Sequence, residues 1–147
     1  LPADKKEILP LIDYLKTDAA EAEILTGTND RVKAAHMLHE WGAKEVHVRA
    51  ACPPILFGCK YLNFSTSRGP LELIARRAIH ELEGGKETDD TVREYADDSS
   101  EKYQAMVDLV CKEMGFTSLK SQPLKDTLAS IGVPQEGLCT YCWDGAE

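Results

Sequence analysis

The segment "LIDYLKTDAAEAEILTGTNDRVKAAHMLHEWGAKEVHVRA", residues 11–50, decides the expected fold because β-like runs at its two ends enclose two helix-like runs. Residues 11–15 are a short apolar run that we interpret as a buried strand. Residues 45–51 place β-branched side chains at alternate positions, which is typical of a strand. A strand, helix, helix, strand order of this length is a crossover that joins two parallel strands.

The two helices of this segment are indicated by their ends and by one apolar stripe. Asp18 and Glu21 have the spacing of a capping box, and Gly27 suits a helix end. The second helix has apolar residues at helical spacing, namely Ala34, Met37, Leu38 and Trp41. We therefore expect Trp41 to pack against the parallel strands.

The chain changes character after about residue 65. Residues 70–131 carry three helical patterns and no obvious strand, with apolar stripes at 71–82, 103–114 and 124–131. The predicted fold class is therefore α/β, with a small parallel-sheet βαβ N-terminal part followed by a mainly helical C-terminal half.

Composition limits the partners that we expect. The chain has 147 residues, a net charge of −8 and a pI near 5.0, which argue against nucleic acid or an anionic membrane as a partner. No apolar run approaches the roughly 20 residues of a membrane span. Five cysteines, an odd number without regular spacing, argue against a secreted disulfide framework. We expect a protein of the reducing cytoplasm, and a homo-oligomer is compatible with the sequence.

Four segments resemble, in order, the C-terminal part of amidophosphoribosyltransferase. They are "GAKEVHVRAACPPILFGCKYLNFS" (42–65), "ELIARRAIHELEG" (72–84), "FTSLKSQPLKDTLASIGVP" (116–134) and "LCTYCWDG" (138–145). This resemblance covers residues 42–147 and departs from the family's usual Tyr-Gly-Ile-Asp-Thr at residues 61–65. It implies a transferase of purine biosynthesis, which converts phosphoribosyl pyrophosphate and glutamine to 5-phosphoribosylamine.

Residues 1–46 resemble a different family, the ribokinase-like (phosphofructokinase-B) carbohydrate kinases. The Asn-x-x-Glu motif with which those kinases organise magnesium and phosphate would fall on Asp18 and Glu21, with Asp in place of Asn. An ordinary capping box also explains both residues. The sequence thus predicts a chimera, joined between residues 41 and 46.

The amidophosphoribosyltransferase resemblance implies a metal site. In members that carry a [4Fe–4S] cluster, three ligands match Cys59, Cys139 and Cys142, and the fourth comes from a region upstream. Cys52, Cys111, a water or a small thiol are candidates for the fourth position. Zinc on the same cysteines, a redox dithiol and uncoordinated thiols are the alternatives. If they are not ligands, Cys52 and Cys111 are expected to be buried as small apolar residues.

Motifs for bond-making are missing from this sequence. It begins with Leu1 in place of the cysteine nucleophile of the glutaminase half, and it lacks both the pyrophosphate-binding loop and the kinase catalytic Asp segment. We expect the chain to be inactive alone and to act with the missing catalytic regions of the parent enzyme. A fragment of a carbohydrate kinase and a non-catalytic, metal-stabilised interaction domain are the alternatives.

Overall fold

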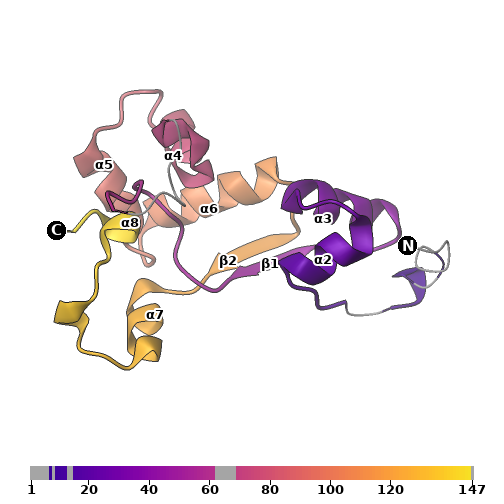
Figure 1. Ribbon diagram of the computed structural model, residues 1–147. Coiled ribbons are helices and arrows are strands. Elements are labelled where there is room, and N and C mark those ends of the chain that lie inside the picture. The colour runs from indigo at the N-terminus through magenta and orange to yellow at the C-terminus, as the bar shows by residue number, and fades with distance from the viewer. Residues whose placement is uncertain (1–6, 8, 13–14, 62–68, 147) are drawn as a thin grey trace. The chain divides into compact units, whose positions relative to one another are not determined.

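The computed structural model describes residues 7, 9–12, 15–61 and 69–146. The chain divides into two compact units (Figure 1). Unit 1 contains Leu1–Val48 and Met114–Ser118, and unit 2 contains Arg49–Glu113 and Leu119–Glu147.

Unit 1 is built on a pair of helices, α2 (Ala19–Thr26) and α3 (Arg31–Glu40), which contact each other and follow the short 3-10 turn η1 (Leu9–Leu11). The side chain of Asp30 caps α3 by accepting hydrogen bonds from backbone amides in the first turn of the helix. The α2 helix ends at Gly27, whose φ of 75° is left-handed and suits glycine. The start and the end of α2 agree with the sequence prediction. Trp41, whose packing we predicted, is the C-cap residue of α3 and is half-buried.

The small sheet consists of β1 (His47–Ala50) and β2 (Ser118–Ser121). The amide of Thr117 donates to the carbonyl of Val46 at 2.8 Å, and that of Gln122 donates to Ala50 at 3.0 Å. The paired residues advance in the same direction along both strands, so the strands are parallel. The predicted small α/β fold with a parallel sheet is therefore confirmed.

The strand that pairs with β1 is not the one that the sequence predicted. Leu11 belongs to η1, and Leu11, Ile12 and Leu15 are 81%, 39% and 41% exposed, so the described part of residues 11–15 is neither a strand nor buried. Asp13 and Tyr14 lie outside the described residues. The prediction of a strand-free second half was also wrong, because β2 lies there. A short apolar run is compatible with a buried strand but by itself establishes neither burial nor strand pairing.

Unit 2 is helical, as predicted for residues 70–131. Its helices are η3 (Pro70–Glu72), α4 (Ile74–Leu82), α5 (Asp89–Arg93), η4 (Glu94–Ala96), α6 (Glu101–Glu113), α7 (Leu124–Ile131), η5 (Gln135–Gly137) and α8 (Tyr141–Asp144). The α4 helix packs on α6 and buries Ala75, Ala78 and Ile79, which belong to the predicted stripe. The core also contains Leu56, Phe57, Val92, Tyr95, Met106, Val107 and Val110.

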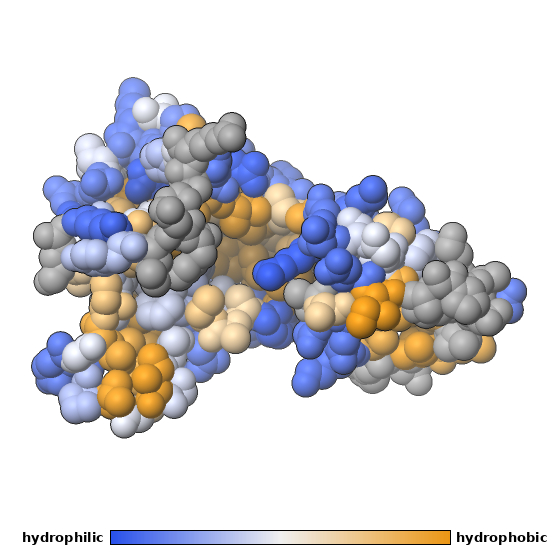
Figure 2. Space-filling view, in the orientation of Figure 1, coloured by the Kyte–Doolittle hydropathy of each residue, from blue (hydrophilic) through white to orange (hydrophobic). Residues whose placement is uncertain are grey.

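Unit 2 exposes apolar side chains at α7. Leu128 is buried, but Ile131 and Val133 at the end of the helix are 49% and 50% exposed. Figure 2 shows the corresponding apolar surface over α7. None of the helices in the described residues is both long enough and apolar enough to cross a bilayer.

Candidate metal centre

The C-terminal tail docks on the loop that follows β1. The backbone amides of Leu56 and Phe57 donate to the carbonyl of Cys142 at 2.9 and 3.0 Å. Both residues are almost fully buried, at 1% and 5% exposure. Two hydrogen bonds in a buried setting therefore fix the short helix α8 next to a loop that lies far upstream in the sequence (Figure 1).

Phe57 anchors this contact. Its ring lies 5.6 Å from the ring of Tyr141, measured between centroids, and the planes are tilted by 45°. The guanidinium groups of Arg76 and Arg93 lie 5.7 and 5.9 Å from the centroid of the Phe57 ring, within cation–π range. Gly145 adopts φ 72°, and a Cβ there would lie 2.9 Å from Cε2 of Phe57. The tail therefore fits the loop only because residue 145 has no side chain.

The docked tail brings Cys142 into contact with Cys59, two of the three cysteines that the sequence analysis selected. The pKa of the Cys142 thiol is raised, first by burial, then by a hydrogen bond with the Cys59 thiol and by the negative charge that Cys59 and Cys139 carry when ionised. Cys59 and Cys142 are half-buried and Cys139 is exposed. The Cys142 and Cys59 thiols are thus in hydrogen-bond contact, and the Cys139 thiol is near enough to Cys142 to affect its pKa.

The chemistry of these donors fits a soft metal. Thiolates bind iron and zinc well, and a cation beside these sulfurs would favour their deprotonated form. Within the described residues, however, no group of three His, Cys, Asp or Glu side chains already has the arrangement of a metal site. The three thiols would have to turn toward a common centre when a metal binds.

The two remaining cysteines behave differently from expectation. Cys52 is exposed, so the prediction that it is a buried apolar residue was wrong, and Cys111 is half-buried on α6. The loop that follows turns inward directly after Cys52, because Pro53 and Leu56 are buried. Neither Cys52 nor Cys111 affects the pKa of Cys142.

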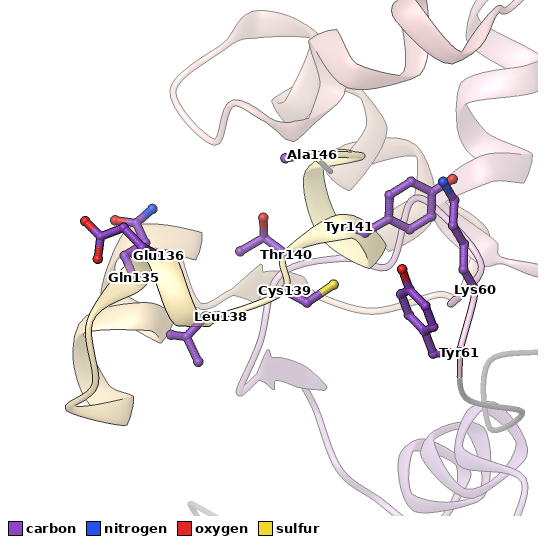
Figure 3. A pocket seen from close by; sticks show the side chains of 9 residues that line it. All are labelled: Lys60, Tyr61, Gln135, Glu136, Leu138, Cys139, Thr140, Tyr141 and Ala146. Carbon is purple, nitrogen blue, oxygen red and sulfur yellow. The ribbon is translucent and has the colours of Figure 1, made fainter.

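A cavity of about 410 Å³ opens beside Cys139 (Figure 3). Lys60 and Tyr61 contribute from the loop after β1, Glu136 from η5, and Thr140 and Tyr141 from the tail. The Lys60 ammonium lies 4.2 Å from the centroid of the Tyr141 ring. Sequence reasoning missed this cavity because no local pattern links residues so far apart in the chain.

The other predicted site residues, Asp18 and Glu21, lie in unit 1 at the start of α2. The Asp18 amide donates to Oε2 of Glu21 at 2.9 Å, and the Glu21 amide donates to Oδ1 of Asp18 at 2.8 Å. The capping-box interpretation is therefore confirmed. A role in binding phosphate or magnesium stays a prediction.

Comparison with known proteins supports one of the two resemblances. Over 123 residues, or 83% of its length, the chain is 31% identical to amidophosphoribosyltransferases of Mycobacterium bovis and Mycobacterium tuberculosis. It is 29% identical to that of Mycobacterium leprae over the same share of the chain. The matched region covers only 17–18% of these relatives, so the chain spans less than a fifth of their length. No family model and no solved structure matches.

The extent of the match bears on the predicted join. A span of 123 residues is longer than residues 42–147, so the similarity includes part of the chain before residue 42. The kinase resemblance receives no support from these comparisons. The chimera, with its parts at 1–46 and 42–147, stays a prediction.

Proposed function

We propose that this chain corresponds to the C-terminal region of an amidophosphoribosyltransferase-like enzyme, and that its role is to hold a structural or regulatory metal centre. The observation that carries this proposal is the docking of α8, in which the Cys142 carbonyl accepts from the amides of Leu56 and Phe57 and the Cys142 thiol is hydrogen-bonded to that of Cys59. The sequence similarity to amidophosphoribosyltransferases is consistent with it.

The centre that we propose is a [4Fe–4S] cluster, with zinc as the alternative. Iron–sulfur clusters and structural zinc sites both take cysteine thiolates, and a Cys-x-x-Cys turn lets two sulfurs reach one centre. Cys59, Cys139 and Cys142 would be the ligands. When bound, the metal would tie the tail to the loop after β1, in addition to the contacts of Phe57.

The transfer chemistry would belong to the regions of the parent enzyme that this sequence lacks. We propose that those regions are the partner of the chain, in the cytoplasm, and that the chain alone forms no phosphoribosylamine from ammonia and phosphoribosyl pyrophosphate. This fits the absence of a pyrophosphate-binding loop from the given sequence. The kinase-fragment alternative is weaker, because the carboxylates of Asp18 and Glu21 already cap α2.

Anaerobic reconstitution with iron and sulfide tests the metal centre. We expect broad visible absorption and bound iron and sulfide in the wild-type chain. Replacing Cys59, Cys139 or Cys142 with Ser should abolish both, because each thiolate is one of only three protein ligands. The exposed Cys52→Ser variant is the matched control and should keep the cluster.

The same variants loaded with zinc under reducing conditions test the alternative. A zinc site would be favoured if the wild-type chain retained zinc and the three Ser variants lost it, while reconstitution with iron and sulfide gave no iron–sulfur absorption. The proposal would be contradicted if the wild-type chain bound neither iron nor zinc.

A further inference from the structure

A hydroxyl, an imidazole and a carboxylate form one hydrogen-bonded row in unit 1. Oγ of Ser118 lies 2.8 Å from Nδ1 of His47, and Nε2 of the same ring lies 2.9 Å from Oε2 of Glu45. A nucleophile in reach of a base, with the base held by a third group, is the arrangement that activates serine. We propose that Ser118 is a site of acylation by activated esters, with His47 as its general base and Glu45 as a positioning residue. The inference is independent of the metal centre, because the cysteines belong to unit 2.

Backbone hydrogen bonds between the two strand segments hold this row in place. Val46 lies between Glu45 and His47, and its amide donates to Oγ1 of Thr117 at 2.9 Å. Its carbonyl accepts from the amide of Thr117 at 2.8 Å. Thr117 directly precedes Ser118 at the start of β2, which runs beside β1 (Figure 1). The backbone therefore fixes the hydroxyl and the imidazole next to each other before any reagent arrives.

The carboxylate of Glu45 decides which ring nitrogen acts as the base. An ionised carboxylate only accepts hydrogen bonds, so in the neutral imidazole Nε2 carries the proton that it donates to Glu45. Nδ1 then has a lone pair, and the Ser118 hydroxyl donates to it. In the serine protease triad the two ring nitrogens have the opposite partners. Either nitrogen of a neutral imidazole can accept a proton, so the roles of the three side chains are unchanged.

The step transfers an acyl group and needs no further reactant. Oγ of Ser118 bonds to the carbonyl carbon of the ester while its proton passes to Nδ1 of His47. The bond from that carbon to the leaving oxygen then breaks, and the leaving group takes the proton from the imidazole. The amides of Thr117 and Ser118 donate to the carbonyl of Val46, so neither is aimed at the oxyanion that forms. We therefore expect slow, single acylation and not rapid turnover. The side chains of His47 and Glu45 are 46% and 64% exposed, so a small ester can reach them.

Excess p-nitrophenyl acetate, added at pH 8 to the full, metal-free chain reduced with a phosphine, tests the inference. Peptide mass spectrometry locates and times each acetyl group, which separates serines from cysteines and lysines. Ser130 is an internal control, because it is exposed but its hydroxyl donates to the carbonyl of Thr127. We expect Ser118 to be acetylated roughly a hundredfold faster than Ser130, the lower end of general-base catalysis. His47→Gln should reduce the rate at Ser118 to that at Ser130.

Glu45 is tested by the charge that it supplies. Glu45→Gln should slow acetylation of Ser118 about fivefold, the effect of losing one exposed charge partner of the imidazolium. Glu45→Asp keeps the carboxylate and should recover part of that rate. The matched control Glu40→Gln, at the exposed end of α3, should react as wild type. Acetylation of Ser118 no faster than that of Ser130, or an undiminished rate in His47→Gln, would overturn the inference. Equal rates in Glu45→Gln and wild type would overturn the role of Glu45.

Discussion

Replacing Gly145 with Ala tests whether the tail is held by its fit against Phe57. The glycine has φ 72° and is buried, and a Cβ on it would lie 2.9 and 3.0 Å from two carbons of the Phe57 ring and 3.0 Å from Nε of Arg93. Phe57 cannot easily move aside, because it is 5% exposed and packed against Tyr141. The new methyl group must therefore strain the site or release the tail.

The expected cost has two parts. A left-handed φ costs a non-glycine residue about 1 kcal/mol, and overpacking a buried site costs about 1–3 kcal/mol. Gly132 is a matched control, because it has the same φ of 75° but would meet no atom within 4 Å. Gly132→Ala should lose about 1 kcal/mol of unfolding free energy from the backbone alone, and Gly145→Ala roughly 2–4 kcal/mol.

Urea unfolding of the metal-free, reduced chain measures these free energies. A second readout is the alkylation rate of Cys142, followed by mass spectrometry of its peptide, because this thiol should become accessible when the tail is released. We expect faster alkylation of Cys142 in Gly145→Ala than in Gly132→Ala. Equal destabilisation of the two variants, with Cys142 equally protected in both, would refute the steric argument.

Two further predictions concern single side chains. The pKa of Glu87 is lowered, mainly by its 2.8 Å hydrogen bond to Nδ1 of His80. Its contribution to stability is therefore present above the unfolded pKa of about 4.3 and is lost as the pH falls through the lower folded value. Glu87→Gln should therefore unfold at a lower urea concentration than wild type at pH 7. Between pH 6 and pH 3 its free energy of unfolding should fall less than that of wild type. Parallel pH profiles of the two proteins would contradict this. Asp18→Ala should lower the free energy of unfolding by about 1 kcal/mol because it removes the cap of α2, whereas Asp18→Ser should retain most of that stability. The midpoints of urea unfolding measure both effects. If magnesium stabilised the wild type and neither variant, Asp18 would have a role beyond capping.

The parts of the fold that the sequence predicted are those with local signals. The capping box of Asp18 and Glu21 and the glycine at the end of α2 each act within one or two helical turns. The apolar stripe of α4 likewise follows from spacing alone, and it correctly placed Ala78 and Ile79 in the core.

Long-range pairing could not be read in the same way. The strand β2 has four residues, with Leu119 as its sole large apolar side chain, and its sequence resembles a loop before a helix. A shared site for the three cysteines was expected from family resemblance, whereas the features that dock the tail, the buried ring of Phe57 and the glycine at 145, carry no recognisable motif. The cavity beside Cys139 is lined by Lys60 and Glu136, which lie far apart in the sequence.

The pairing of β1 with β2 has a consequence for how the chain folds during synthesis. Val46 and Thr117, which are hydrogen-bonded to each other, lie 71 residues apart in the sequence. At a ribosomal rate of about 5–20 residues per second, β1 would wait several seconds for its partner, with its backbone hydrogen-bonding groups unpaired. Unpaired strand edges promote association between nascent chains. Shortened versions that end before residue 117 should therefore aggregate more readily than the full chain, even if all of α2 to α6 can form.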